Sequence, residues 1–154
     1  MTCTDNLIEK LMEMEGCRLE AYLDAAGVPT IGYGHTKGVR MGDKISEYWA
    51  KEYLRQDIDE VEQQVKELNV AHTEGQLDAL VSFAFNLGIG RLKASTLLET
   101  IRKGGSKAQI QREFKKWVYA DGKKLAGLVK RREWEAKRFF EVPEITDDDI
   151  INRA

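Results

Sequence analysis

Three side chains near the start of the chain, Glu15, Asp24 and Thr30, are of types that can carry acid–base chemistry. A carboxyl group that keeps its proton can act as a general acid, and a carboxylate beside a hydroxyl can bind and activate a water molecule. Eight residues separate Glu15 from Asp24, and five separate Asp24 from Thr30. A general acid and a water-binding pair are the groups that a hydrolysis reaction uses, although each residue taken singly has an ordinary structural explanation.

The position of Glu15 follows from an amphipathic helix that the sequence predicts from Thr4 or Asp5 onward. Leu7, Ile8 and Leu11 recur at helical spacing, and Glu15 lies one turn beyond Leu11. A carboxyl group at the end of an apolar stripe is partly removed from water and near the negative helix terminus, and both favour its protonated form. The alternative is a solvated helix end without a catalytic role.

The segment 17–45 is rich in glycine and in residues that favour extended backbone, which predicts a small antiparallel hairpin or three-stranded sheet. Ala25-Ala26-Gly27 marks a turn, with Asp24 before it and Thr30 after it. Because neighbouring strands lie about 4.8 Å apart, the two side chains can share one water. The alternatives are turn chemistry for Asp24 and strand propensity for Thr30.

The rest of the chain is predicted to be helical. A stripe of about twenty residues after Ser46 is long enough to connect two lobes. Two patterns resemble capping boxes, Thr73 to Gln76 and Ser106 to Gln109. The first opens the most apolar helix, which we expect to form the core. The tail from Pro143 is predicted to be a loosely attached last helix.

Composition limits the class of protein. The 154 residues are 42% hydrophobic and 32% charged, which fits one globular domain. The two cysteines, Cys3 and Cys17, form no disulfide framework and are expected to be free thiols. The sequence has neither an apolar run of membrane-spanning length nor a secretory signal pattern at its start, so we expect a protein made in the cytoplasm without membrane insertion.

Charge is distributed unevenly along the chain. Residues 1–90 hold 8 Lys and Arg against 16 Asp and Glu, whereas residues 91–140 hold 15 against 5. Such a split favours contact between the C-terminal half and a polyanion. The alternative is a set of ordinary solvated helix faces.

The motifs taken together resemble the phage-type lysozymes, the glycoside hydrolase family of phage endolysins. Residues 15–36 resemble the N-terminal signature of that family, whose pattern is Glu, eight residues, Asp or Cys, five residues, Thr. Residues 76–88 resemble its central-helix motif, and 95–98 its next segment. Residues 117–135 resemble its C-terminal motif, so the resemblance covers about 7–140.

The resemblance implies an α+β, mainly helical, two-lobed lysozyme-like fold with a small N-terminal antiparallel sheet, a long connecting helix and a helical C-terminal lobe. Residues 1–154 then form a single catalytic domain. Its sheet lobe covers about 14–60, and its helical lobe about 61–142 plus the N-terminal helix, with 143–154 as a tail. The cleft between the lobes would bind glycan.

The resemblance also implies an activity, which is hydrolysis of the β-1,4 bond between N-acetylmuramic acid and N-acetylglucosamine in peptidoglycan. Glu15 would protonate the leaving oxygen, while Asp24 and Thr30 would position and activate water. An inverting reaction requires carboxyl groups roughly 6.5–9.5 Å apart, and a retaining one about 5–5.5 Å. We expect inversion.

Further residues are carried over from the resemblance as supporting or substrate-binding groups. His35 is expected to pair with Asp57 as structural support. Arg131 or Arg132 would hold Glu15 by a charged hydrogen bond, which would favour the ionised form and oppose burial. The alternative is that these arginines simply cover the surface. The candidate substrate-binding residues are Thr36, Phe85, Asn86, Ser95 and Thr96. A core role for Phe85 is equally compatible with its apolar stripe.

No cofactor or metal is expected, because His35 and His72 lack ligand spacing. The expected partner is the peptidoglycan glycan strand rather than nucleic acid, and the expected state is a monomer that reaches the cell wall through a membrane pore or another delivery route. Two alternatives stay open. One is a lytic transglycosylase, which needs no water-positioning pair. The other is a non-catalytic peptidoglycan-binding module.

Overall fold

The structure, a computed structural model, describes residues 1–142. Within this range it contains seven helices and two small antiparallel sheets, which confirms the expected mainly helical α+β class. The elements are α1 (Asp5–Glu15), β1 (Arg18–Leu23), β2 (Pro29–Gly32), α2 (Glu47–Lys66), α3 (Glu74–Leu87), α4 (Ile89–Lys93), α5 (Thr96–Arg102), α6 (Lys107–Lys115), β3 (Tyr119–Ala120), β4 (Lys123–Lys124) and α7 (Ala126–Arg138). The predicted tail helix lies outside the described residues.

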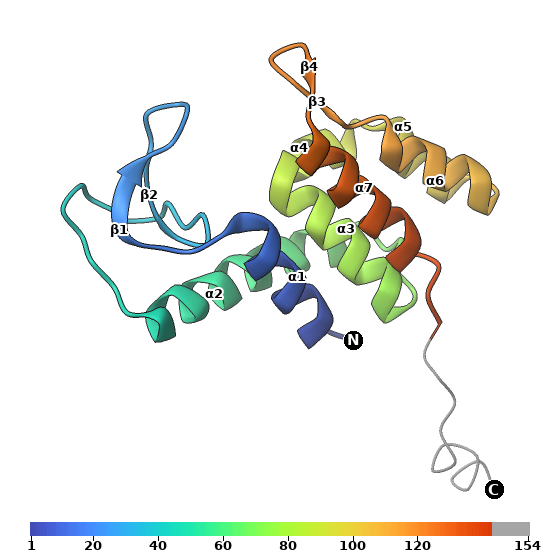
Figure 1. Cartoon of the computed structure of the whole chain (residues 1–154). Helices are drawn as coiled ribbons and strands as arrows, with labels where there is room; N and C mark the ends of the chain where they lie inside the picture. The colour runs from blue at the N-terminus through green and yellow to red at the C-terminus, as the bar shows by residue number, and fades with distance from the viewer. Residues whose placement is uncertain (143–154) are drawn as a thin grey trace, which may run out of the picture.

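The elements are arranged along α2 (Figure 1). The β1–β2 sheet lies near the N-terminal end of α2 and the helices α3 to α7 near its C-terminal end, while α2 contacts both β2 and α3. Ser46 caps α2 by accepting a hydrogen bond from the backbone N–H of Trp49. The long helix predicted after Ser46 is therefore present, and it connects the sheet with the helical part.

The β1–β2 hairpin has Tyr22 opposite Thr30 and Leu23 opposite Pro29. A further segment pairs with the outer edge of β1 through a single bridge between Glu20 and Lys44. The sequence left open a hairpin or a three-stranded sheet, and the structure has a two-stranded sheet with this additional bridge.

The core is centred on α3, which contacts α1, α2, α4 and α7. Its side chains are buried on nearly all sides, including the polar residues Asp78 and Ser82. Gly75 allows α3 to begin against the end of α7, because a methyl group there would collide with the carbonyl oxygen of Arg138. The most apolar segment of the sequence is thus the central helix, as expected.

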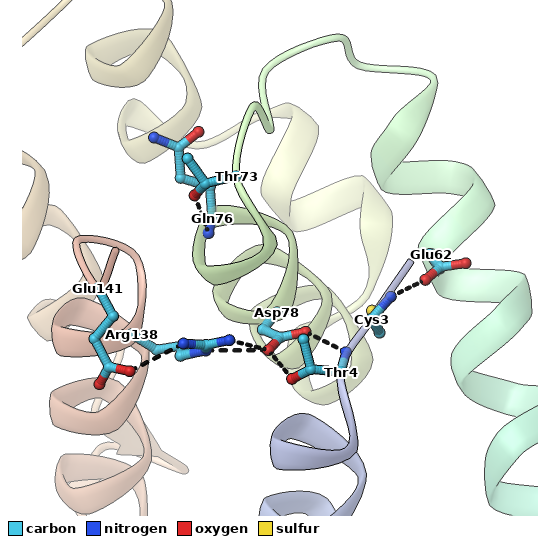
Figure 2. A network of polar contacts seen from close by, with 8 residues as sticks. All are labelled: Cys3, Thr4, Glu62, Thr73, Gln76, Asp78, Arg138 and Glu141. Carbon is cyan, nitrogen blue, oxygen red and sulfur yellow. Dashed lines mark hydrogen bonds and ion pairs between the residues drawn. The ribbon is translucent and has the colours of Figure 1, made fainter. Parts of the chain in front are cut away.

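Asp78 joins the start of α1 to the end of α7 (Figure 2). Its Oδ1 accepts a hydrogen bond from the backbone N–H of Thr4 at 3.0 Å, and its Oδ2 accepts from the hydroxyl of Thr4. Arg138 donates to the same Oδ2 from Nε at 3.1 Å and from Nη2 at 2.9 Å. Because Asp78 is completely buried, these contacts fix α1 at the end opposite to Glu15.

One of the two expected capping boxes is complete. Ser106 and Gln109 satisfy each other's backbone N–H groups at the start of α6. At α3, the hydroxyl of Thr73 accepts from the backbone N–H of Gln76, but the Gln76 side chain accepts from the N–H of His72 instead of Thr73. The predicted contact of the Gln76 side chain with the backbone N–H of Thr73 was therefore wrong, because the donor is the residue before it.

Candidate active site

Glu15 is the last residue of α1, where the sequence placed it. The chain leaves the helix at Gly16, which has a φ of 67° and so adopts a conformation that favours glycine. The Glu15 side chain is 24% exposed, and its Oε1 accepts a hydrogen bond from Arg131 Nη1 at 2.7 Å. A methyl group at Gly34 would lie 3.5 Å from Glu15 Oε2. The carboxyl group therefore lies between α7 and the turn after β2, and remains accessible.

Arg131 is the arginine that contacts Glu15, which settles the choice that the sequence left open. Arg131 is buried, and its Nη2 donates to the backbone carbonyl of Ser82 at 3.0 Å. Arg132 instead donates to Asn86 Oδ1 at 2.7 Å. The two adjacent arginines of α7 thus bind different partners, Glu15 and Asn86, and both partners line the same cavity.

Asp24 follows the last residue of β1 and shapes the hairpin turn. Its Oδ1 accepts hydrogen bonds from the backbone N–H groups of Ala26 and Val28, both at 2.9 Å. Within residues 1–142, its second carboxylate oxygen has no hydrogen-bond partner. The turn chemistry expected as an alternative is present, and it fixes one oxygen while the other remains available.

Thr30 is buried, and its hydroxyl donates to the carbonyl of Val28 at 2.9 Å. Because Thr30 is opposite Tyr22, and the Asp24 backbone N–H bonds to the Val28 carbonyl, Asp24 and Thr30 are diagonal neighbours across the hairpin. Such neighbours share a face of the sheet, with Cα atoms about 7–8 Å apart. This spacing suits a bridging water between the two side chains.

A cavity of about 520 Å³ borders Glu15. Its lining is formed by Lys10, Glu13, Met14, Glu15, Asn86, Leu125, Gly127, Leu128, Lys130 and Arg131. Three of the sequence-predicted site residues are thus brought together here, namely Glu15, Asn86 and Arg131. Asp24 and Thr30 lie on the β1–β2 hairpin outside this lining. The separation of the two carboxyl groups, and with it the inverting outcome, stays a prediction.

His35 and Asp57 make the contact that the sequence predicted. His35 Nδ1 lies 2.9 Å from Asp57 Oδ2 and 3.1 Å from Oδ1, and the imidazole stacks on the Tyr53 ring at 4.4 Å. Burial raises the pKa of the Asp57 carboxyl above its usual range, while the hydrogen bond and charge of His35 act in the opposite direction. Mutual backbone hydrogen bonds between Ile31 and His35 close the turn that carries Gly34, so the pair anchors this turn to α2.

The other candidate substrate-binding residues lie elsewhere. Ser95 is the buried N-cap of α5 and accepts from the backbone N–H of Leu98. Thr96 is exposed and donates to Glu113, and Phe85 packs against the core. Thr36 is exposed, and its carbonyl accepts from the N–H of Val39. None of these four residues lines the cavity beside Glu15.

Glu135 is buried next to the site, and no role was predicted for it from the sequence. Its Oε2 accepts from the hydroxyl of Ser82 at 2.6 Å and from Arg132 Nη2 at 3.2 Å. Burial raises the pKa of Glu135 to about 7, although Arg132 and Arg131 oppose this rise. Its spacing of three and four residues from the two arginines was the signal that could have indicated an ion-pair cluster.

Among residues 1–142, no group of three or more His, Cys, Asp or Glu side chains could hold a metal ion. In the same part of the chain, no helix combines the length and hydrophobicity required to cross a membrane.

Comparison with known protein families gives a match over most of the chain. The family described as phage lysozyme matches residues 12–135. The chain belongs to the phage lysozyme family. The resemblance drawn from the sequence motifs is therefore confirmed.

Individual members of the phage lysozyme family are similar to this chain in sequence and fold. The endolysin of Bacillus phage B103 is 44% identical over 140 residues, a match of 86% of this chain and 52% of that protein. The chain thus spans about half the length of that relative. The endolysin of Acyrthosiphon pisum secondary endosymbiont phage 1 is 41% identical over 132 residues, covering 82% of this chain and 89% of that protein.

The structural similarity extends over nearly the whole described fold. The muramidase domain of SpmX from Asticaccaulis excentricus has a TM-score of 0.84 and 30% sequence identity. The match covers 92% of this chain and 99% of that domain. Sequence and structure comparisons therefore indicate the same family and a lysozyme-like fold.

Proposed function

We propose that this member of the phage lysozyme family is an endolysin that hydrolyses the β-1,4 bond between N-acetylmuramic acid and N-acetylglucosamine in peptidoglycan. Family membership, the two endolysin relatives and the muramidase fold support hydrolysis of the cell wall. The observation that carries the proposal is an accessible carboxyl group, Glu15, held by the buried Arg131 on the wall of a cavity of about 520 Å³.

Glu15 is the proposed general acid. It protonates the leaving glycosidic oxygen, which requires a carboxyl group that substrate can reach but that does not rotate freely. The hydrogen bond from Arg131 supplies the orientation, and the 24% exposure of the side chain supplies the access.

Asp24 and Thr30 are proposed to bind the attacking water. Asp24 Oδ1 is occupied by backbone N–H groups, so Oδ2 is the oxygen that accepts a proton from water. The Thr30 hydroxyl already donates to Val28, so its oxygen acts toward water as an acceptor. A water that donates to both oxygens directs a lone pair away from them, toward the anomeric carbon. This arrangement supports the inverting reaction.

Asn86 is the candidate substrate-binding residue with geometric support. It lines the same cavity as Glu15, and its Oδ1 accepts from Arg132. The amide nitrogen is therefore turned away from Arg132 and can donate to a sugar hydroxyl. The roles of Thr36, Phe85, Ser95 and Thr96 stay predictions.

The proposal is tested by lysis of cells whose outer membrane has been removed, with the wild type, Glu15→Gln and Asp24→Asn. The lysis rate of Glu15→Gln should be about 10²–10⁴-fold lower than that of the wild type, because a positioned general acid accelerates a reaction by about this factor. Glu9→Gln is the matched control, since Glu9 is an exposed residue of the same helix and should lyse cells like the wild type. Undiminished lysis by a correctly folded Glu15→Gln would refute the assignment.

Product analysis distinguishes hydrolysis from the lytic transglycosylase alternative. Hydrolysis adds one water to the released sugar, whereas transglycosylation leaves an anhydro sugar. The presence of both Asp24 and Thr30 favours the hydrolysed mass. Binding to peptidoglycan without any released product would instead support the non-catalytic module.

Two finer expectations accompany the proposal. We expect a monomer, which light scattering in solution would test. We also expect lysis from inside a cell to require a membrane pore or another delivery route. With a pore as the route, expression with and without a pore-forming protein should differ in the onset of lysis.

A further inference from the structure

A buried carboxylate lies behind the two arginines of the site. Glu135 is fully buried, with Arg131 Nε 3.6 Å from its Oε2 and Arg132 Nε 3.0 Å from its Oε1. Each of these arginines reaches a different group on the cavity wall, Glu15 for Arg131 and Asn86 for Arg132. Glu135 therefore contacts both arginines whose other ends bind Glu15 and Asn86.

We propose that Glu135 is a positioning residue of the active site, whose carboxylate holds Arg131 against the general acid Glu15 and Arg132 against Asn86. The inference deepens the proposed lysozyme function and rests on it. Glu135 itself does not line the cavity, so it acts through the arginines and not on the substrate.

Charge balance is the first argument. Arg131 and Arg132 are both buried and adjacent, so two positive charges lie together in the interior. Within the described residues, the carboxylates that contact them are Glu15 and Glu135. Removal of the charge on Glu135 would leave two guanidinium groups with Glu15 as their remaining counter-charge. Their combined field would then favour the ionised form of Glu15, which cannot act as an acid.

Charge supplements an incomplete set of hydrogen bonds within the cluster of Arg131, Arg132 and Glu135. Arg131 Nε, Arg132 Nε, Arg132 Nη1 and Glu135 Oε1 are buried without a hydrogen-bond partner among the described residues. The Arg132 guanidinium instead lies 5.1 Å from the centre of the Phe83 ring. The negative charge of Glu135 therefore attracts the Nε sides of both guanidinium groups, while their Nη2 atoms donate to Ser82 and Asn86.

The groups around Glu135 determine the pH range in which its carboxylate is charged. On its own helix it faces Arg131 and Arg132, from α3 it faces the hydroxyl of Ser82, and from α6 Gln111 donates to the neighbouring carbonyl of Ala136. The pKa of Glu135, raised by burial to about 7, then makes the carboxylate neutral in acid and ionised in mild alkali. A glutamine at this position mimics the neutral form, so its effect should depend on pH.

The test compares Glu135→Gln with Glu133→Gln, a matched control at an exposed position of the same helix. The initial rate on purified peptidoglycan is measured from pH 5 to pH 9, together with circular dichroism and the melting temperature. The initial rate of Glu135→Gln should equal that of the wild type near pH 5.5 and be about tenfold lower at pH 8. The fall of the rate on the alkaline side of the profile should therefore occur about one pH unit lower than in the wild type. Glu133→Gln should follow the wild-type profile.

A second variant keeps the inference testable if Glu135→Gln does not fold. Ser82→Ala removes the hydroxyl that donates to the Glu135 carboxylate but retains the backbone carbonyl that accepts from Arg131. It should shift the alkaline limb in the same direction by a smaller amount. A pH profile of unchanged shape in the folded variants, with only a lower melting temperature, would overturn the positioning role.

Failure of the proposed function would look different. If the wild type releases no product from peptidoglycan at any pH, the lysozyme proposal fails. If the wild type is active and both variants keep its pH profile, the positioning role alone is refuted.

Discussion

The backbone of Val28 contacts both side chains that are proposed to bind water. Its N–H donates to Asp24 Oδ1, and its carbonyl accepts from the Thr30 hydroxyl. The hairpin turn therefore fixes both side chains through the backbone of one residue. Movement of this turn would displace both acceptors of the water at once.

Thr30→Val tests this arrangement. Valine keeps the size of the side chain but removes the oxygen that accepts from water, so we expect a rate about 10- to 100-fold lower, since such a hydrogen bond is worth about 1–3 kcal/mol. Thr30→Ser retains the hydroxyl and should recover most of the activity. Turnover on soluble glycan, measured with the melting temperature, provides the check, and a Thr30→Val rate equal to that of Thr30→Ser would contradict the role.

The position of Glu15 could be predicted from the sequence because it depends on local spacing. The apolar residues before it and Gly16 after it fix the end of α1. Its partner could be narrowed only to Arg131 or Arg132, because Arg131 lies 116 residues away and is followed by a second arginine. Neighbouring residues on a helix point about 100° apart, so the rotation of α7 decides which arginine contacts Glu15.

The turn between β2 and α2 is held from one side by a partly buried ion pair. His35 and Asp57 connect it to the middle of α2, and the ring of Tyr53 covers the imidazole. A second pair nearby, Lys37 with Glu60 at 2.9 Å, makes a similar connection in full contact with water. Because the two pairs connect the same turn to α2, they show how burial changes the contribution of such a pair to stability.

We expect His35→Ala to reduce the free energy of unfolding by about 1–3 kcal/mol, because the hydrogen bonds and the stacked ring are lost and Asp57 remains partly buried. Lys37→Gln should leave the urea midpoint close to that of the wild type, because exposed pairs contribute little. Equal midpoints for both variants in urea denaturation would show that burial gives the His35 pair no advantage.

The starts of the helices show where local signals were sufficient. Ser46 and Ser106 each accept from the backbone of the following turn. Thr4 begins α1 as expected, but its hydroxyl bonds to the distant Asp78 instead of the helix backbone. A cap that is replaced by a tertiary contact cannot be recognised from neighbouring residues alone.

The stability of the folded protein should depend on pH through Glu135. Its pKa of about 7 in the fold exceeds its ordinary value of 4.5, so between these pH values the folded protein binds a proton that the unfolded chain has released. The contribution of Glu135 to the free energy of unfolding is therefore largest below pH 4.5 and falls as the pH rises to about 7.

Urea denaturation of the wild type and Glu135→Gln at pH 5 and pH 8 checks this dependence. The difference in free energy of unfolding, wild type minus variant, should decrease by about 1–3 kcal/mol from pH 5 to pH 8. The exposed control Glu133→Gln should keep a constant difference. Parallel pH curves for the wild type and Glu135→Gln would show that Glu135 does not titrate in this range.

The basic segment 91–140 contributes Lys130 and Arg131 to the cavity beside Glu15. Lys10 and Glu13 from α1 line the same cavity. If these charges attract the anionic wall, added salt should slow lysis of cell walls more than hydrolysis of a short neutral oligosaccharide. Rates on both substrates between about 20 and 300 mM salt provide the measurement. Equal salt dependence would leave the basic residues without a role in substrate attraction.

The contacts between Glu15 and Arg131, and between Thr4 and Asp78 with Arg138, join the beginning of the described chain to its last helix. During synthesis, the residues of α1 leave the ribosome long before those of α7. The nascent polypeptide can therefore form the hairpin and α2 early, but it cannot complete the acid group's surroundings until α7 has emerged. Catalytic competence should consequently arise only after α7 has emerged from the ribosome.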